Sequence, residues 1–333
     1  MRAKRKCLKH AGLLLMALLG CWRLGEAQEQ MKLSYSSVDA SNAVWQVAKE
    51  AGFYKKYGLD VDLLFILSTT TSVASLLSGD VRVGNASGGA VASAVLGGSD
   101  LVMTACFINI LPYELVVQDS VKSAQNLRGK SIGISRVGSA SDVAARALIK
   151  ALGLEPVKDV PIIQVGGPPE RAAAFRTGRI AGFPSPPAVI ELAKGMPHRV
   201  LISTADFKER FDFPYICPTT TRRYLSERRD TVKRIIMALI EATHFFKTHK
   251  AESKKIMAKY SRQDDEVYLE RAYNAYAKIH DRVPLVTRKG TEIQIKEAVA
   301  RKPGAVLRVE EMVDDSIVVE LEKDGFIDRV YQQ

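Results

Sequence analysis

The sequence predicts an α/β protein built from two lobes. Short apolar stretches that suit strands alternate with helical stretches of roughly ten residues, and this alternation starts twice along the chain. The chain has 333 residues, which is enough for about two domains. With 47% hydrophobic and 26% charged residues, the composition is that of a globular protein and excludes disordered, collagen-like and coiled-coil chains.

Residues 1–27 are predicted to be a secretory signal that does not belong to the fold. A strongly basic start is followed by an apolar run over residues 11–21, which is short of the roughly twenty residues that span a bilayer. Two cleavage sites remain open. Gly25-Glu26-Ala27 suits ordinary signal peptidase, whereas Leu18-Leu19-Gly20-Cys21 resembles a lipobox, which would end the signal at residue 20 and lipidate Cys21. Either site gives an exported product.

The charge of the chain argues against nucleic acid as a partner. Residues 1–27 hold six basic residues and one acid, so removing them lowers the net charge from +11 to +6. The remaining charge is spread along the chain, without a dense basic run that contains aromatic residues. We therefore expect no nucleic-acid binding, and after residue 27 we find no stretch that is long and apolar enough to cross a membrane.

The first unit begins with a strand at residue 31. Its expected strands are 31–37, 59–67, 81–86, 101–110 and 114–118, and its expected helices are 42–54, 72–77 and 88–96. Strands that alternate with helices in this way imply parallel strands joined by helical crossovers.

The second unit repeats the pattern. The helix at 139–152 has a clear apolar periodicity, and the helix at 168–177 begins with two prolines, which suit a first helical turn. The expected strands are 131–135, 160–165, 180–183 and 199–203, with a third helix at 188–194. Beyond it we expect an extended segment at 215–218 and helices at 229–248, 251–260, 264–279, 291–300 and 310–323.

The helical C-terminal part must pack on one of the two lobes. If it returns to the first lobe, the chain crosses between the lobes twice, near 113–118 and near 207–214. This arrangement makes residues 31–115 and 215–333 lobe I and residues 116–214 lobe II. Two crossings form a hinge, and a ligand would lie in the cleft between the lobes.

The residues offer no catalytic centre and no metal site. The histidines His198, His244, His249 and His280 have no metal-binding spacing, and the chain lacks a GxSxG elbow and a phosphate-binding GxxxxGK[ST] loop. We therefore expect no catalytic residue, no metal and no cofactor.

Two cysteines, Cys106 and Cys217, remain after the signal. Without a CxxC motif or a nearby histidine cluster they cannot form a zinc site. Export permits a disulfide between them, and two buried free thiols are the alternative that we expect.

Small polar residues recur where strands end and helices begin. In parallel α/β sheets, ligands bind outside the carboxyl ends of the strands, and a helix start offers free N–H groups and a partial positive charge. Any one of these residues is also an ordinary helix cap, but several turns that face one cleft favour binding. The candidates are Ser68, Thr69, Thr70, Ser87, Gly88, Gly89, Ser139, Ser141 and Ser185, with Trp45, Tyr113, Phe183 and Tyr215 as aromatic candidates.

Several motifs resemble one family. They are Val47-Ala48-Lys49-Glu50-Ala51-Gly52-Phe53-Tyr54-Lys55-Lys56-Tyr57-Gly58-Leu59-Asp60-Val61, Leu76-Leu77-Ser78-Gly79-Asp80, Asn126-Leu127-Arg128-Gly129-Lys130-Ser131-Ile132-Gly133 and Asp230-Thr231-Val232. Together they are similar to the substrate-binding proteins of ABC transporters for sulfonates, taurine and thiamine precursors, the NMT1/THI5-like group. The resemblance covers residues 31–330.

The resemblance implies a two-lobed type II periplasmic binding protein fold with a two-strand hinge. It implies capture of a small solute and its delivery to a membrane permease. The exported leader and the polar turns add the expectation of an anionic or polar solute, and we expect the periplasmic protein to be a monomer. The ligand-contacting turns would then include Ser36 and Ser37 as well as Ser68 to Thr70, Ser87 to Gly89, Ser139 to Ser141 and Ser185.

The resemblance leaves several ligand classes open. Alkanesulfonates or taurine come first, a pyrimidine-type thiamine precursor stacked on Trp45 comes second, and aromatic acids follow. One branch of the family contains a hydroxymethylpyrimidine phosphate synthase, which is an enzyme. Because this chain has isolated cysteines and a secretory signal, the enzyme alternative ranks below solute binding.

Overall fold

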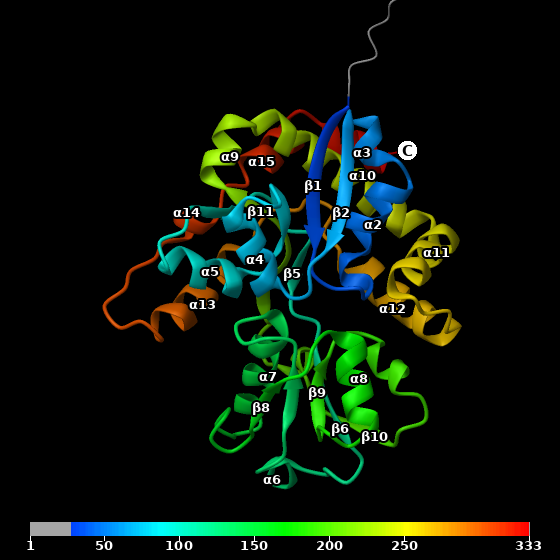
Figure 1. Cartoon of the computed structure of the whole chain (residues 1–333), viewed down its shortest axis with the longest axis vertical. Helices are drawn as coiled ribbons and strands as arrows, with labels where there is room; N and C mark the ends of the chain where they lie inside the picture. Colours follow the sequence, from blue (N-terminus) through cyan, green and yellow to red (C-terminus); the bar gives the residue numbers. More distant parts are fainter. Residues whose placement is uncertain (1–27, 333) are drawn as a thin grey trace, which may run out of the picture.

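A computed structural model describes residues 28–332, so the predicted signal, both cleavage sites and Cys21 lie outside the described residues. Figure 1 shows two lobes stacked along the long axis of the molecule, each built on its own sheet. We call the part with the six-stranded sheet lobe I and the part with the five-stranded sheet lobe II. The exact division near residues 115 and 215 stays a prediction. None of the described helices combines the length and the apolar character that crossing a membrane requires.

The sheet of lobe I has the strand order β2-β1-β3-β11-β4, with β5 paired to β11. β1 runs parallel to β2 and β3, as the strand–helix alternation predicts, whereas β11 runs antiparallel to β3, β4 and β5. The antiparallel strand arises because β11 enters lobe I on its return from lobe II. The strands are β1 (Glu29–Tyr35), β2 (Leu59–Phe65), β3 (Val83–Ala86), β4 (Leu101–Met103), β5 (Ile108–Ile110) and β11 (Asp212–Thr221).

The sheet of lobe II has the order β10-β6-β9-β7-β8. β7 is parallel to β8 and β9, and β6 is antiparallel to β9 and β10. Both sheets are therefore mixed, with a parallel part where the alternation is regular. The strands are β6 (Glu114–Gln118), β7 (Ile132–Ile134), β8 (Ile162–Gln164), β9 (Gly182–Ser185) and β10 (His198–Ser203).

The helices cover both sheets. In lobe I they are η1 (Ala40–Asn42), α2 (Ala43–Glu50), α3 (Phe53–Lys56), α4 (Thr69–Ser78), α5 (Gly88–Leu96) and the C-terminal set from α9 onward. In lobe II they are α6 (Ala124–Leu127), α7 (Ala140–Ala151), α8 (Pro168–Arg176), η2 (Val189–Ala193) and η3 (Thr204–Asp206). The C-terminal set comprises α9 (Arg222–Glu227), α10 (Arg229–Thr248), α11 (Lys250–Ser261), α12 (Glu266–Ile279), α13 (Arg288–Val299), α14 (Val309–Met312), α15 (Ser316–Lys323) and α16 (Phe326–Tyr331).

Several predicted elements are interrupted for local reasons. The expected helix 42–54 is divided, because Gly52 adopts a left-handed φ of +80° between α2 and α3. The expected helix 310–323 is divided at Val313, which bridges to Met103 of β4. The expected strand 101–110 becomes β4 and β5, and the expected helix 188–194 is the 3-10 helix η2.

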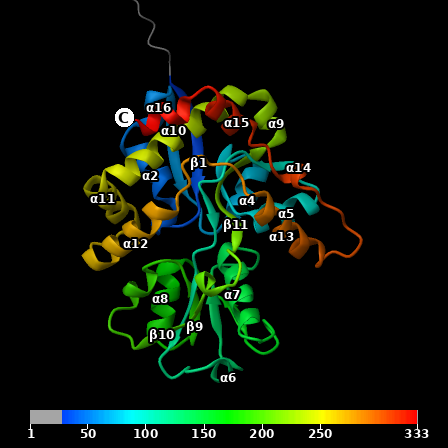
Figure 2. The same ribbon diagram turned by 180° about the vertical axis from the view of Figure 1, so that it is seen from behind.

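The C-terminal helices return to lobe I, as Figure 2 shows from behind. α10 packs against α2 and α3, and α13 packs against α5 and β11. Glu241 of α10 is buried and accepts hydrogen bonds from Lys56 Nζ at 2.6 and 2.8 Å and from the Tyr57 hydroxyl. These contacts attach the last third of the chain to the first strand–helix unit.

The chain crosses between the lobes twice, which confirms the predicted hinge. One crossing joins β5 to β6 through Leu111–Tyr113, and the other joins β10 to β11 and begins at Thr204. Thr204 Oγ1 donates to the Leu111 carbonyl oxygen at 2.6 Å and accepts from the Tyr113 N–H at 3.2 Å. The Thr204 N–H donates to the Tyr113 carbonyl oxygen at 2.9 Å. The two crossings are therefore hydrogen-bonded to each other.

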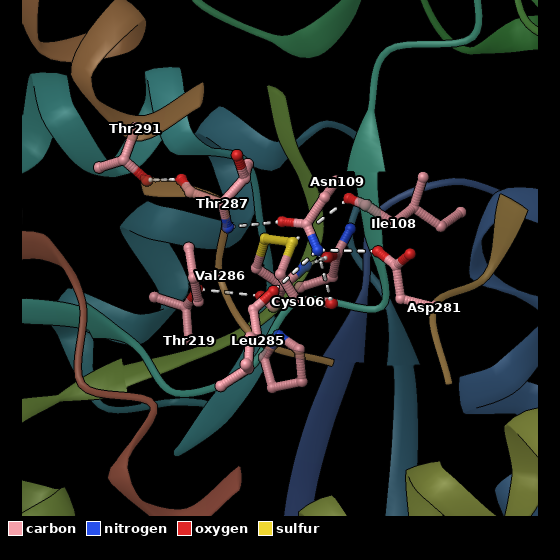
Figure 3. The surroundings of a disulfide bond; sticks show 12 residues. Cys106, Ile108, Asn109, Thr219, Asp281, Leu285, Val286, Thr287 and Thr291 are labelled. Carbon is pink, nitrogen blue, oxygen red and sulfur yellow. Dashed lines mark hydrogen bonds between the residues drawn. A yellow bond between two sulfur atoms is a disulfide. The ribbon is translucent and has the colours of Figure 1, made fainter. Parts of the chain in front are cut away.

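Cys106 and Cys217 form a disulfide, so the expectation of two free thiols is wrong (Figure 3). The backbone explains the pairing, because the Phe107 N–H donates to the Ile216 carbonyl oxygen at 2.8 Å and holds the segment after β4 against β11. Beside the disulfide, Asn109 Nδ2 donates to Asp281 Oδ2 and the Leu285 carbonyl oxygen, both at 2.8 Å. The bond lies in lobe I, which one chain crossing leaves after β5 and to which the other returns at β11.

Candidate ligand-binding site

A cavity of about 30 Å³ lies between the lobes, at the carboxyl ends of β1, β2 and β7. Its walls are mostly hydroxyl-bearing side chains, and one cationic side chain, Arg171, reaches it from lobe II. The lining residues are Ser36, Ser37, Leu67, Ser68, Thr69, Tyr113, Ser135, Ser139, Ala140, Ser141, Gly167, Pro168, Arg171 and Tyr215. This is where ligands bind in open α/β sheets.

A larger groove of about 1090 Å³ lies elsewhere on lobe I, lined by the amino-terminal halves of β1 and β2 and by α9. Its acidic and basic residues are interspersed, and it is open to solvent. We place the candidate site in the smaller cavity instead, because there both lobes contribute buried polar groups.

The lobe I wall is formed by the turns after β1 and β2. Ser68 caps α4: its Oγ accepts from the Thr70 N–H at 3.3 Å, and its own N–H donates to the Ser36 carbonyl oxygen at 3.0 Å. Ser68 has φ of +79°, which is unfavourable for a residue with a side chain and costs about 1–3 kcal/mol. Strain of this kind is concentrated at functional sites.

The lobe II wall contains a triangle of serine hydroxyls. The Oγ atoms of Ser135, Ser139 and Ser141 lie 2.8–3.0 Å from one another, and Ser141 Oγ also accepts from the Ser135 N–H at 2.9 Å. Ser139 is the N-cap of α7, and Gly167 is the N-cap of α8. With α4 from lobe I, three helix starts meet at the cavity, and each brings the partial positive charge of a helix N-terminus.

Arg171 is the residue that distinguishes this cavity from a cluster of helix caps. Its side chain is only 2% exposed, and Nη1 donates to the Pro184 carbonyl oxygen at 2.6 Å. The guanidinium also lies 5.8 Å from the centre of the Phe183 ring. Within residues 28–332 no carboxylate forms an ion pair with it. A buried cation whose partners are carbonyl oxygens and an aromatic ring, without a carboxylate, favours an anion beside it.

The hinge side of the cavity carries two tyrosines. The hydroxyls of Tyr113 and Tyr215 lie 3.1 Å apart, and their rings meet edge to face. Burial raises the pKa of Tyr113 to about 12, with Arg171 acting in the opposite direction. Burial, with smaller contributions from Tyr113 and Asp39, also raises the pKa of Tyr215 well above its usual value. Both are therefore neutral hydroxyls at physiological pH.

Ion pairs join the lobes at the rim of the cleft. Glu191 of η2 pairs with Arg271 of α12, and Lys194 Nζ lies 3.6 Å from Asp265 Oδ2. Thr70 Oγ1 donates across the cleft to the Val137 carbonyl oxygen at 3.3 Å. The structure is thus a closed arrangement with contacts outside the cavity.

The structure brings many of the sequence-predicted residues together on the cavity wall. They are Ser36, Ser37, Ser68, Thr69, Tyr113, Ser139, Ser141 and Tyr215. They meet because each follows a strand whose carboxyl end faces the cleft, or lies beside a chain crossing. That they touch a ligand stays a prediction.

Other predicted residues are not on the wall. Trp45 is fully buried in the core under α2, because it lies on the apolar face of that helix. Ser87 lies behind the wall, where its Oγ donates to Thr69 Oγ1 at 3.1 Å. Thr70 faces Val137 at the rim, as described above.

The remaining four also serve packing or local bonding. Gly88 lies against Pro214 and Gly89 against Gln294, so close that a side chain at either position would crowd its neighbour. Ser185 Oγ donates to the Pro186 carbonyl oxygen at 3.0 Å. Of the aromatic candidates, Phe183 lies in the core of lobe II.

Sequence reasoning missed Arg171 and Ser135. A signal for Arg171 was present, because it stands in the first turn of α8, where the helix dipole disfavours a cation by about 0.3–1 kcal/mol. A basic residue in that position needs another reason, which the buried cavity provides. Ser135 directly follows β7 and carried no signal beyond being polar.

Comparison with known structures gives the class of fold. The nitrate-binding protein NrtA of Synechocystis superposes with a TM-score of 0.73 at 16% identity, covering 89% of this chain and 88% of that one. The alkanesulfonate-binding protein SsuA of Xanthomonas axonopodis, bound to MOPS, gives 0.70 at 16% identity, covering 86% and 98%. A protein of Bordetella bronchiseptica gives 0.75 at 16%, covering 90% and 98%. The chain has the fold of periplasmic binding proteins, as predicted.

Residues 25–261 match the NMT1-like family, and the chain belongs to that family. A relative from Brucella abortus is 25% identical over 267 residues, covering 78% of this chain and 81% of its own. YtlA of Bacillus subtilis is 25% identical over 303 residues, covering 87% and 88%. Both carry names that propose a binding function without naming a ligand.

Proposed function

We propose that the protein is the solute-binding component of an ABC-type importer and that it captures a small anionic or polar organic solute between its lobes. The observation that carries this proposal is Arg171, a buried cation without a carboxylate partner in the described chain, on a cavity wall where three helices begin. Structural neighbours named for nitrate and alkanesulfonate binding support an anionic solute.

The magnitudes favour a site in which Arg171 is the main anchor. A micromolar affinity corresponds to about −8 kcal/mol. Three helix starts contribute roughly 0.3–1 kcal/mol each, which is too little alone. Hydrogen bonds to charged groups contribute about 1.5–3 kcal/mol each, so a guanidinium that binds an acid group through two of them makes such an affinity accessible.

The closed cavity, of about 30 Å³, has room for only a few water molecules. A solute of several heavy atoms therefore requires the lobes to part slightly at the hinge. This size supports short alkanesulfonates or taurine before aromatic acids. A pyrimidine-type ligand stacked on Trp45 loses its support, because Trp45 is 0% exposed.

The proposal includes the setting of the protein. We infer that residues 1–27 direct export to the periplasm, that cleavage at the lipobox would leave a lipid anchor on Cys21, and that the mature protein acts as a monomer with a membrane permease. We propose no conversion of the bound solute, and a synthase-like activity is the alternative.

The test is ligand binding by residues 28–333, measured by thermal shift with a panel of small organic acids and then by calorimetry. At about 100 times Kd a ligand stabilises the folded state by about 2.7 kcal/mol. Arg171→Met should weaken binding by about 10- to 100-fold, whereas Arg171→Lys should retain part of it. Arg176→Met, an exposed position on the same helix, is the matched control.

Equal affinity of Arg171→Met and the parent for the anion would overturn the proposal, provided that circular dichroism shows the same fold. Release of a chemically altered product, detected by mass spectrometry after incubation without a permease, would favour the synthase-like alternative.

A further inference from the structure

A second buried charge lies beside the cavity, on the lobe opposite Arg171. Asp39 is 2% exposed and follows the turn that contributes Ser36 and Ser37 to the wall. Its carboxylate accepts from Ser37 Oγ at 2.9 Å, from the Ser41 N–H at 2.9 Å and from the Ser41 hydroxyl. Within residues 28–332 no lysine, arginine or histidine forms an ion pair with it.

Asp39 is linked to the cavity by one hydrogen bond. Ser37 lines the cavity, and its only hydroxyl proton is directed to Asp39 Oδ2. The Ser37 oxygen can therefore only accept a hydrogen bond from a group in the cavity. Backed by a carboxylate, it offers a negative site to a donor such as an ammonium group.

Three buried tyrosines lie near enough to Asp39 to respond to its charge. The negative charge of Asp39 contributes to the raised pKa of Tyr113, of Tyr215 and of Tyr276, so all three lie within its field. The Tyr276 hydroxyl is buried and has no hydrogen-bond partner among residues 28–332. Aromatic rings near a carboxylate form surroundings that stabilise a small organic cation.

The two buried charges belong to different lobes: Arg171 lies on the cavity wall, and Asp39 lies behind the wall residue Ser37. Arg171 belongs to lobe II and Asp39 to lobe I, and both act on Tyr113. A solute with an acid group alone would satisfy Arg171 but would meet the negative potential of Asp39. A solute that carries both an acid and an ammonium group would satisfy both charges, and its net charge of zero would match the sum of the two.

We propose that the ligand is a small zwitterion, an amino acid or aminosulfonate whose acid group binds Arg171 and whose ammonium group faces Ser37 and Asp39. This inference rests on the proposed function and refines it. It excludes simple organic acids as the preferred solutes.

The experiment compares matched pairs that differ in one group. Calorimetry at pH 7 measures taurine against 2-hydroxyethanesulfonate, β-alanine against 3-hydroxypropanoate, and glycine against glycolate. The amino member of at least one pair should bind about tenfold or more tightly than its hydroxyl partner, a difference of about 1.4 kcal/mol. In Asp39→Asn this preference should fall to about threefold or less, while the hydroxyl member binds as well or better.

Asp39 is the N-cap of η1, and asparagine is itself a good helix N-cap, so Asp39→Asn should keep the fold. Ser37→Ala is a second variant, which removes the accepting oxygen but leaves Asp39 and should reduce the same preference. Asp62→Asn, an exposed carboxylate on β2, is the control that should change nothing.

The outcomes separate this inference from the proposed function. If organic acids bind and the amino members have no advantage in any pair, the zwitterion proposal is overturned and the proposed function stands. An amino preference that persists in both Asp39→Asn and Ser37→Ala also overturns it. If no solute of the whole panel binds, both are overturned.

Discussion

The hydroxyl of Thr204 joins the two chain crossings of the hinge by two hydrogen bonds. The substitution Thr204→Val removes these two bonds. The side chain is 7% exposed, and valine has nearly the same shape. The substitution deletes the bond from Thr204 Oγ1 to the Leu111 carbonyl oxygen, at 2.6 Å, and the bond that it accepts from the Tyr113 N–H, at 3.2 Å. The backbone bond from Thr204 N–H to Tyr113 remains.

The expected cost follows from these two bonds. Each neutral hydrogen bond contributes about 0.5–1.5 kcal/mol. The Tyr113 N–H and the Leu111 carbonyl oxygen keep a bond to each other at 3.0 Å, so neither is left without a partner. We therefore expect a loss of about 1–2 kcal/mol in the free energy of unfolding, measured by urea denaturation with circular dichroism. The melting temperature should fall by roughly 2–8 °C.

Thr204→Ser is the matched control, because it keeps the hydroxyl and loses only a methyl group. If Thr204→Val unfolds at the same urea concentration as the parent, the hydroxyl does not stabilise the hinge. If the serine variant loses as much stability as the valine variant, the effect comes from packing, and the reasoning is refuted.

Three further predictions concern the disulfide, the rim of the cleft and a buried histidine. Replacing Cys106 and Cys217 by alanine should lower the free energy of unfolding by up to about 4–5 kcal/mol, because the bond closes a loop with a sequence separation of 111; an unchanged urea midpoint would contradict this. The Glu191–Arg271 pair joins the lobes at an exposed rim, so salt screens a contact that holds the lobes closed around a ligand. Ligand affinity should therefore decrease a few-fold from low to high salt. The affinity of Arg271→Ala should depend less on salt than that of the parent. Burial lowers the pKa of His280 to about 4, so as the pH falls the unfolded chain binds a proton before the folded protein does. The free energy of unfolding should therefore decrease as the pH falls from about 6.5 towards 4. Urea titrations at several pH values can check this, and His280→Asn should lose less stability over the same range.

The position of the site was predictable because it depends on strand direction. Parallel strands end at one edge of a sheet, so the polar residues after them meet there, as Ser36, Ser68 and Ser139 do. These residues lie in the turns that follow the strands, and their location follows from the alternation of elements.

Other features depend on contacts that the order of elements does not reveal. Arg171 reaches the cavity through a long side chain from within a helix, and Trp45 turns away from it because the apolar face of α2 points into the core. The disulfide formed because β11 returns beside the segment after β4, a pairing between residues 111 positions apart. The antiparallel direction of β11 has the same origin.

The disulfide has a mechanical consequence. Every strand of lobe II, from β6 to β10, lies inside the loop that Cys106 and Cys217 close. A pulling force applied to the two ends of the chain would pass through the sulfur–sulfur bond and bypass lobe II. The loop closed by the disulfide spans 111 residues, which reach roughly 370–400 Å when fully extended. In optical tweezers the fully unfolded oxidised chain should therefore be shorter than the reduced chain by this length.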